Sequence, residues 1–280
     1  MDRRFWLGIS LVCAQAFGVL EQVAEIPVST GVPAWNQKIT QAAKDLEAQG
    51  TSTKDGYAQC AETQEIEGAY LCGYTDVKNM NLAFTRISLF TEGNFGHKKG
   101  TLPLQNSPLV AQGIQYIGGH DLRKKHLVEF FELAEKECPT NANACLNKQE
   151  KELYDDLIEP LEKGGKDFVV VTYAIRSFMS WRDVVTHEIM HAQYFLQSKF
   201  QQVADDFWLN DVREEDKKYA KQELSQYYDI QDDYLVRNEF QAYMLMAGAS
   251  RSVLARLVPL YRDRLLDELH KVNVEPVQVH

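Results

Sequence analysis

Residues 181–200 constrain the fold of this chain most, because they predict one long helix that carries two histidines one turn apart. The segment contains no Gly or Pro, which favours an unbroken helix. Ser180 can cap its first turn, with Asp183 three residues on in the position of a capping-box acid. In a helix, residues four positions apart share a face. We therefore expect the His187 and His191 side chains to project from the same side.

The two histidines belong to the pattern H-E-x-x-H, which runs from His187 through Glu188 to His191. Two imidazoles so placed can bind one Zn²⁺ from the same side. Glu188 lies one position around the helix, where its carboxylate can reach a water on the metal, as a general base must. The competing interpretation is an ordinary amphipathic helix with this spacing by chance. Its apolar face would consist of Val184, Val185, Ile189, Ala192 and Phe195.

A predicted strand lies directly before this helix. Residues 167–175 are rich in β-branched and aromatic side chains, a composition typical of strands. A strand that leads into an H-E-x-x-H helix resembles the zincins, a class of zinc metallopeptidases. The resemblance covers residues 167–245 and implies an α+β, zincin-like fold. In such a fold a small mixed N-terminal part has an edge strand leading into the zinc helix, and the C-terminal half is mostly helical.

The resemblance also implies a third protein ligand, because a catalytic zinc has three and keeps one position open. The metzincin pattern would place Gly and His where this chain has Tyr194 and Gln197, so that class is excluded. The G-T-x-D run of the aspzincins is not found downstream. The gluzincins take a Glu from a later helix, and Glu239, among apolar neighbours on a predicted helix, suits this role.

Alternatives to Glu239 as a ligand stay open at this point. An acid among apolar side chains is costly to bury unless it is paired or bound to metal. Glu239 could instead form a buried ion pair with Arg237 or Arg251. Asp205 or Asp206 could then supply the third ligand.

The predicted chemistry is metal-assisted hydrolysis of an amide bond. Zn²⁺ on His187, His191 and Glu239 would lower the pKa of its water towards about 7. Glu188 would take a proton from that water and deliver it to the leaving amine. Many gluzincins have an acid four residues after the ligand Glu, where this chain has Tyr243, and Tyr243 is our candidate for stabilising the oxyanion. The other candidate donors are Tyr234, Tyr228 and His270.

A peptide or protein substrate is the expected partner. The strand at 168–174 could lie at a sheet edge and pair with an extended peptide, although its three consecutive valines are also typical of an interior strand. Two rival functions stay open. One is a zinc amidase for cell-wall peptide or a dedicated protein, with the loop-rich residues 92–119 covering a narrow cleft. The other is a secreted binding protein with a structural zinc, although such a site would not need Glu188.

Composition limits the remaining possibilities. With 280 residues, of which 45% are hydrophobic, the chain can bury a sizeable core as one large domain or two modest ones. A formal net charge of -10 argues against nucleic acid as the main partner, because phosphates would be repelled. No apolar run is long enough to span a bilayer. The oligomeric state stays open.

The first residues resemble a secretory signal. A basic start, a short apolar stretch and an A-x-A-type site that ends at Ala16 predict cleavage there and export to a periplasm or medium. A buried N-terminal helix is the alternative. We therefore divide the chain into a signal peptide (1–16), an N-terminal arm (17–50) and a zincin-like metallopeptidase domain (51–280).

Cysteine spacing supports export. Cys60 and Cys72 flank one short segment, and Cys138 and Cys145 flank another. We therefore expect two local disulfides, formed in an oxidising compartment, although other pairings or free thiols stay open. None of the four has C-x-x-C spacing, which argues against a second zinc site.

Periodicity and turn residues predict the other elements. In the first half we expect a linker at 27–33, a helix at 34–49, a strand at 81–91, a loop-rich segment at 92–119 and helices at 120–137 and 148–163, the last interrupted near Pro160. In the second half we expect helices at 181–200, 216–228, 233–256 and 259–271.

Overall fold

The computed structural model describes residues 60–63, 65–177 and 180–277. These residues form an α+β fold with one four-stranded sheet, in agreement with the predicted class. The strands are β1 (Cys60–Glu62), β2 (Ala69–Asp76), β3 (Gly119–Arg123) and β4 (Val169–Arg176). The expected signal peptide (1–16), arm (17–50), linker (27–33) and helix (34–49) lie outside the described residues.

Helices both precede and follow β4 in the sequence. Those before it are α3 (Val77–Glu92), α4 (Pro108–Tyr116), α5 (Lys124–Glu137), α6 (Lys148–Leu153) and α7 (Glu159–Lys163). Those after it are α8 (Trp181–Leu196), α9 (Ser198–Asn210), α10 (Glu214–Leu224), α11 (Asp233–Leu245) and α12 (Val258–Lys271). The described elements after β4 are helical, as expected for the C-terminal half.

The sheet has the order β1-β2-β4-β3. β4 runs parallel to β2 and antiparallel to β3, so β4 is interior, and the expectation that it is an edge strand is wrong. Its consecutive valines explain this position, because a strand buried on both faces needs no polar alternation. The edge next to β4 is formed by β3, in which Gly119 pairs with Tyr173 and Arg123 with Val169.

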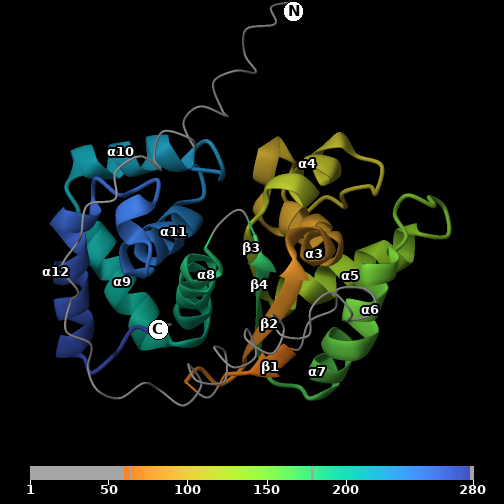
Figure 1. Ribbon diagram of the computed structural model, residues 1–280, viewed down its shortest axis with the longest axis horizontal. Coiled ribbons are helices and arrows are strands. Elements are labelled where there is room, and N and C mark those ends of the chain that lie inside the picture. Colours follow the sequence, from red (N-terminus) through yellow and green to blue (C-terminus); the bar gives the residue numbers. More distant parts are fainter. Residues whose placement is uncertain (1–59, 64, 178–179, 278–280) are drawn as a thin grey trace, which may run out of the picture. The chain divides into compact units, whose positions relative to one another are not determined.

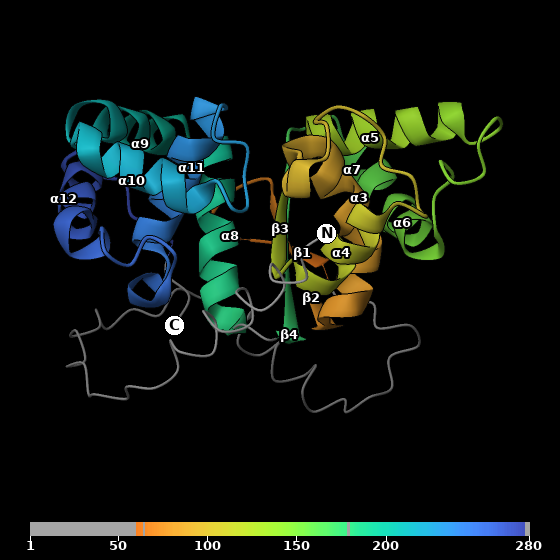
Figure 2. The same cartoon turned by 90° about the horizontal axis from the view of Figure 1, so that it is seen from above.

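Alternate residues of β4 face two hydrophobic cores. Val169, Val171 and Tyr173 belong to the core shared with the C-terminal helices, whereas Val170 and Ala174 belong to the core with α3 and α5. The sheet consequently lies between α8 on one side and α3 on the other (Figure 1 and Figure 2). This two-sided burial holds the end of β4 in place, directly before α8 begins.

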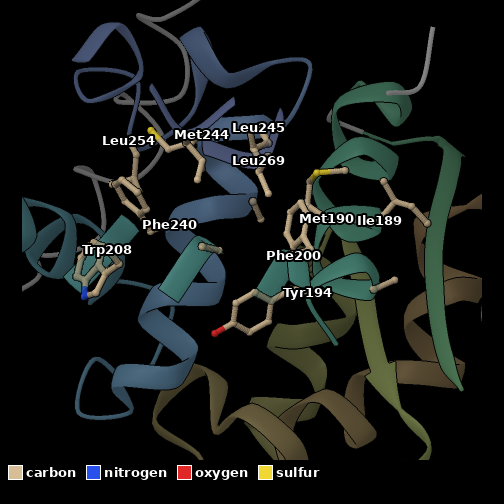
Figure 3. Close-up of a cluster of buried hydrophobic side chains, with 14 of the residues drawn as sticks. Ile189, Met190, Tyr194, Phe200, Trp208, Phe240, Met244, Leu245, Leu254 and Leu269 are labelled. Atoms are coloured by element: carbon tan, nitrogen blue, oxygen red, sulfur yellow. The ribbon is translucent and has the colours of Figure 1, made fainter. Parts of the chain in front are cut away.

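A cluster of apolar side chains joins the C-terminal helices (Figure 3). In this cluster, Phe240 of α11 packs against Trp208 of α9 and Tyr261 of α12, at ring-centroid distances of 4.9 and 6.0 Å. Met190 and Tyr194 contribute the α8 side, and both are buried. Truncating a buried aromatic residue of this kind typically costs about 3–5 kcal/mol, so the cluster holds α11 firmly against α8.

Residues 81–91, expected as a strand, form most of helix α3. Asp76 caps the helix by accepting a hydrogen bond from the Asn79 amide at 2.9 Å, and Gly93 ends it with a φ of 72°. Nearly all side chains in this stretch are buried, because the sheet, α4 and α6 cover different sides of the helix. A helix buried all round lacks the polar face that identifies a surface helix, so its apolar pattern is misleading.

One further expectation for the first half is wrong, and another is incomplete. Residues 119–123 form strand β3, so the helix expected at 120–137 begins only at Lys124. The segment 92–119, expected to be loop-rich, contains helix α4, which Ser107 caps by accepting from the Leu109 amide. In both places short elements follow each other closely, which hides their separate periodicities.

Several helix boundaries also differ. The interruption expected near Pro160 is a π-helical turn, Tyr154–Ile158, between α6 and α7. The helix expected at 181–200 breaks at Gln197 into α8 and α9. The helix expected at 233–256 ends at Leu245, and a short 3-10 turn, Ala249–Arg251, follows.

Both expected disulfides are confirmed. Cys60 and Cys72 are joined across the paired strands β1 and β2, and Cys138 and Cys145 close the loop after α5. Two such bonds are typical of an oxidising compartment. Within the described ranges, no helix has the length and apolar character needed to cross a bilayer.

Candidate metal centre

Helix α8 presents His187 and His191 on one face. The helix begins where Ser180 accepts a hydrogen bond from the Asp183 amide, as the sequence predicts. The Nε2 atoms of the two histidines lie 3.1 Å apart, and both rings are buried. Burial lowers the pKa of each imidazole to about 4. Both rings are therefore neutral near pH 7, which is the form that binds metal.

Glu239 reaches the same point from helix α11. Its Oε2 lies 3.4 Å from His187 Nε2, and its Oε1 lies 3.6 Å from His191 Nε2. The apolar cluster holds α11 against α8, and Gln241 adds a hydrogen bond from its Nε2 to the Met190 carbonyl at 3.3 Å. The structure thus brings together the three residues that the sequence suggests as metal ligands.

The two imidazole nitrogens and the Glu239 carboxylate lie about as close together as the ligands of one tetrahedral ion. Zinc bonds of roughly 2.0–2.1 Å to nitrogen and oxygen separate tetrahedral ligand atoms by roughly 3.3 Å. The two Nε2 atoms lie 3.1 Å apart, and Glu239 approaches them with different oxygens, Oε2 at 3.4 Å from His187 and Oε1 at 3.6 Å from His191, so each of these contacts is close to this value. Three ligands leave one tetrahedral position for another group, as catalytic sites require.

The charges and hydrogen bonds of the cluster also suit a cation. In the described part of the chain, His187 Nδ1 and Glu239 Oε2 are buried without a hydrogen-bond partner. Burial raises the pKa of Glu239, because a desolvated carboxylate is costly. A bound divalent ion would offset this cost. Two neutral imidazoles and one carboxylate form a ligand set that zinc takes in catalytic sites.

Glu188 lies where strand β3 passes α8. Its side chain is hydrogen-bonded to Asp121 of β3. Burial raises the pKa of both carboxyl groups well above the usual values, and the charges of Glu239 and Glu92 add to the effect. Asp121, Glu188 and His191 also form a second group of converging metal-ligand atoms. The site therefore concentrates negative charge around the two imidazoles.

Two tyrosines contact the cluster. The ring of Tyr243 lies 4.5 Å from the ring of His187. The Tyr228 hydroxyl is within hydrogen-bonding reach of both the Glu239 carboxylate and the Tyr243 hydroxyl. Burial raises the pKa of both phenols, so each stays protonated and able to donate.

The other two predicted donors lie elsewhere. His270, near the end of α12, is exposed and hydrogen-bonded to Glu275 at 3.1 Å. The ring of Tyr234 packs against Tyr194 at 5.4 Å and borders a pocket that Asp121 also lines. Tyr228 and Tyr243 are therefore the predicted donors that the structure places at the cluster.

Neither arginine suggested as a partner for Glu239 contacts it. The Arg237 Nε atom donates to Asp205 at 2.6 Å, and the Arg251 guanidinium donates to Asp183, also at 2.6 Å. Both guanidiniums are thus engaged with other carboxylates. Among the described residues, Glu239 has the two histidines within 4.0 Å and no arginine or lysine.

The alternative ligands on α9 are also placed away from the histidines. Asp205 accepts hydrogen bonds from the Arg237 guanidinium and from the Tyr194 hydroxyl, the latter at 2.7 Å. Asp206 is exposed on α9. Asp205 therefore has a structural role between α8, α9 and α11.

Asp121 is a site residue that the sequence analysis missed. The segment around it was assigned to the start of a helix, whereas it forms strand β3. In β3, His120 and Leu122 are buried, and Gly119, Asp121 and Arg123 are half-buried on the face towards α8. This two-residue alternation is a strand signal that could have identified the position.

Asn238 is a second residue that was missed. Its side chain lies close enough to His191 to raise the pKa of the imidazole, and it accepts a hydrogen bond from Gln241 Nε2 at 3.0 Å. Polar residues that contact a metal-binding imidazole, but not the metal itself, help to orient the ring. In the sequence, the only indication that Asn238 belongs to the site is its position next to Glu239.

No protein-family model, no curated protein and no solved structure matches the chain. The observations that carry the argument are therefore the convergence of His187, His191 and Glu239 and the position of Glu188 beside them.

Proposed function

We propose that this protein is a zinc-dependent metallopeptidase of the zincin type with Glu239 as its third ligand. The observation that carries the proposal is the convergence of His187, His191 and Glu239, each of which offers one ligand atom within 4.8 Å of the others. The H-E-x-x-H helix that follows a strand, with a Glu from a later helix, supports the zincin class. The two disulfides support export to an oxidising compartment, in agreement with the proposed signal peptide.

Glu188 is the general base in this proposal. When bound, Zn²⁺ would supply Lewis acidity that polarises the substrate carbonyl and makes a neighbouring water more acidic. Glu188 takes a proton from the attacking water and transfers it to the leaving amine. Asp121, hydrogen-bonded to Glu188, holds that carboxyl group in place.

Tyr228 and Tyr243 are the proposed donors to the oxyanion. Both are protonated phenols at the cluster, and Tyr243 lies directly against His187. A hydroxyl held there can donate to the negative charge that develops on the carbonyl oxygen. The hydrogen bond between Tyr228 and Glu239 places one phenol beside a ligand.

Strand β3 is the proposed place for an extended peptide substrate. It forms an end of the described sheet, and its Gly119 and Asp121 lie against Glu188. Main-chain pairing at an edge strand would place a peptide bond beside the general base. This role moves from β4, which is interior, to its neighbour β3.

Exchange of Glu188 tests the proposed reaction. We expect Glu188→Gln to retain zinc at one ion per chain and to lower peptide hydrolysis by about 10²- to 10⁴-fold. Glu223→Gln on α10 is the matched control and should keep full activity. Zinc content is measured by atomic emission, and hydrolysis on a mixed peptide library by mass spectrometry. Undiminished hydrolysis by the Glu188→Gln protein would remove Glu188 from the mechanism.

Exchange of Glu239 tests the ligand set. Glu239→Ala should weaken zinc binding strongly, because only two protein ligands remain, whereas unchanged zinc affinity would exclude Glu239 as a ligand. The same assays separate the rival functions. A structural zinc would be needed for folding, and a dedicated cell-wall amidase would cleave peptidoglycan fragments but not the peptide library.

A further inference from the structure

A pocket of about 330 Å³ lies beside the candidate metal centre. Asp121 and Asn238 line it, and these residues contact Glu188 and His191 respectively. Phe195, one helical turn after His191, forms part of its wall. A substrate bound at the metal centre would therefore extend a neighbouring group into this pocket.

Arg123 of β3 is the distinctive residue of the pocket. Its guanidinium stacks over the Phe195 ring, 5.0 Å from the centroid. Within the part of the chain that the structure describes, Arg123 forms no salt bridge. It is half-buried, so this cation is partly removed from water without a carboxylate to balance it. Guanidinium groups held in this way bind carboxylates through two parallel hydrogen bonds.

The acids of the pocket are engaged elsewhere. Asp232 accepts from the Lys99 ammonium at 2.9 Å and also caps α11. Asp121 is hydrogen-bonded to Glu188. Glu92 acts on that same pair, since its charge raises the pKa of both carboxyl groups. The charge of Asp232 is therefore offset by Lys99, and those of Asp121 and Glu92 act on Glu188 beside the metal centre.

Basic groups and a phenol surround Arg123 at the other end. Burial lowers the pKa of His126 to about 4, and the charges of Arg123 and Lys99 add to the effect. Arg123 also lowers the pKa of Tyr234, whose overall shift is upward through burial. Both His126 and Tyr234 line the pocket. This end of the pocket thus offers several donors to an anion.

The distance along the two elements suits a peptide. From Asp121 to Arg123, β3 advances by two residues, or roughly 6.6 Å. From His191 to Phe195, α8 advances by four residues, or roughly 6.0 Å. An extended peptide covers this distance in about two residues. A carboxylate one or two residues from the cleaved bond would reach Arg123.

We propose that Arg123, with the Tyr234 hydroxyl, binds a carboxylate of the substrate, so that the enzyme selects peptides with an acidic group one or two residues from the cleaved bond. The carboxylate can come from an Asp or Glu side chain or from a free carboxyl terminus. This inference rests on the proposed function, because it assigns the substrate class of the same site.

Binding is measured on the zinc-loaded Glu188→Gln protein, so that no turnover occurs. One pair of probes is acetyl-trialanine with a free carboxyl terminus and its carboxamide. The other pair is amidated acetyl-alanyl-glutamyl-alanine and its glutaminyl analogue. By calorimetry, we expect at least one acid to bind about tenfold more tightly than its uncharged partner. The pair that shows the difference identifies the source of the carboxylate.

Exchange of Arg123 in this background completes the test. Arg123→Gln should abolish the preference, and Arg123→Lys should keep part of it, because lysine retains the charge but not the paired donors. Arg182→Gln is the matched control, since Arg182 also stacks on an aromatic ring, that of Trp181, at the exposed start of α8. It should retain the full preference. Circular dichroism confirms that each variant is folded.

Two outcomes separate this inference from the proposed function. Suppose that the wild-type protein hydrolyses peptides. If the acid and amide probes then bind equally, or if Arg123→Gln keeps the preference for acids, the carboxylate pocket is excluded while the proposed peptidase function is retained. If no peptide is hydrolysed but the acids bind through Arg123, the pocket is supported and the peptidase function fails.

Discussion

The carboxylate of Glu188 packs directly against the backbone of Gly119. A Cβ atom on Gly119 would lie 2.7 Å from Glu188 Oε1 and 2.6 Å from Val184 Cγ1. Real side chains do not approach so closely, so residue 119 must be Gly for Glu188 to keep its position. The edge strand thereby sets the place of the proposed general base from outside the zinc helix.

Gly119→Ala should therefore impair catalysis without removing the metal. The added methyl group would push the Glu188 carboxylate away, and a displacement near 1 Å can cost about a hundredfold in rate. We expect kcat/KM to fall by about this factor while zinc stoichiometry stays at one. Gly164→Ala, after α7, is the control, because its nearest contact would be 3.2 Å away. Loss of zinc together with activity would contradict this explanation.

Asn238→Ala should weaken metal binding. Asn238 lies beside His191 and is held by Gln241, so its removal takes away a polar neighbour that limits rotation of the imidazole. Loss of such a partner typically lowers metal affinity by about 10- to 100-fold. Competition with a fluorescent chelator measures the affinity. Asn238→Asp keeps an acceptor and should retain most of it, whereas equal affinities for Asn238→Ala and wild type would deny Asn238 this role.

Removal of the metal should leave the protein folded. The two hydrophobic cores are formed by elements from the whole described part of the chain, so folding does not depend on the ion. Zinc at a hundred times its dissociation constant should nevertheless add about 2.7 kcal/mol to the unfolding free energy. Differential scanning fluorimetry should show a rise in Tm of about 5–10 °C with zinc.

Glu239→Gln should abolish this rise in Tm, and Glu215→Gln, an exposed exchange on α10, should keep it. Unfolding of the wild-type protein by chelator alone would instead indicate a structural metal.

Acidification should destabilise the protein through His120. This ring is buried between Ser88, at 2.6 Å, and Asn81, at 2.9 Å, and burial lowers its pKa to about 3. The unfolded chain binds a proton near pH 6.5 and the folded protein does not, so His120 stabilises the fold above pH 6.5 and loses this contribution as the pH falls towards 3. Between pH 6.5 and 4.5 the loss is about 2 kcal/mol.

Urea unfolding at pH 7.5 and 4.5, with chelator present, measures this effect. His120→Gln should be less stable at pH 7.5 but show a smaller difference between the two pH values. His270→Gln, at an exposed position, should show the wild-type difference. Equal pH dependence in the His120→Gln and wild-type proteins would mean that other groups cause the acid sensitivity.

Several features could be predicted from the spacing of residues that lie close together in the sequence. The four-residue interval between His187 and His191 places both on one face of any helix, and Ser180 caps that helix as expected. The spacing within each cysteine pair likewise favours local disulfides, and both are present. These features depend on residues close in the chain, whose relative positions follow from helix geometry and short loops.

Features that depend on burial from several sides were harder to predict. α3 is covered by the sheet and by other helices, so its side chains show no polar face, and residues 81–91 were assigned to a strand. Asp121 was not identified from the sequence for a related reason. Strand β3 has only five residues and continues directly into α5, so its periodicity is short. In both cases neighbouring elements, rather than local periodicity, determine the environment of each side chain.

The sequence by itself determined that two imidazoles and a carboxylate lie together on α8, since 3.6 residues per turn leave no other arrangement once the helix forms. Only the tertiary structure decided that Glu239, rather than Asp205, meets those imidazoles, and that β3, rather than β4, lies at the sheet edge beside Glu188. Contacts between distant segments are selected by the packing free energy of whole helices and strands, which no short stretch of residues encodes.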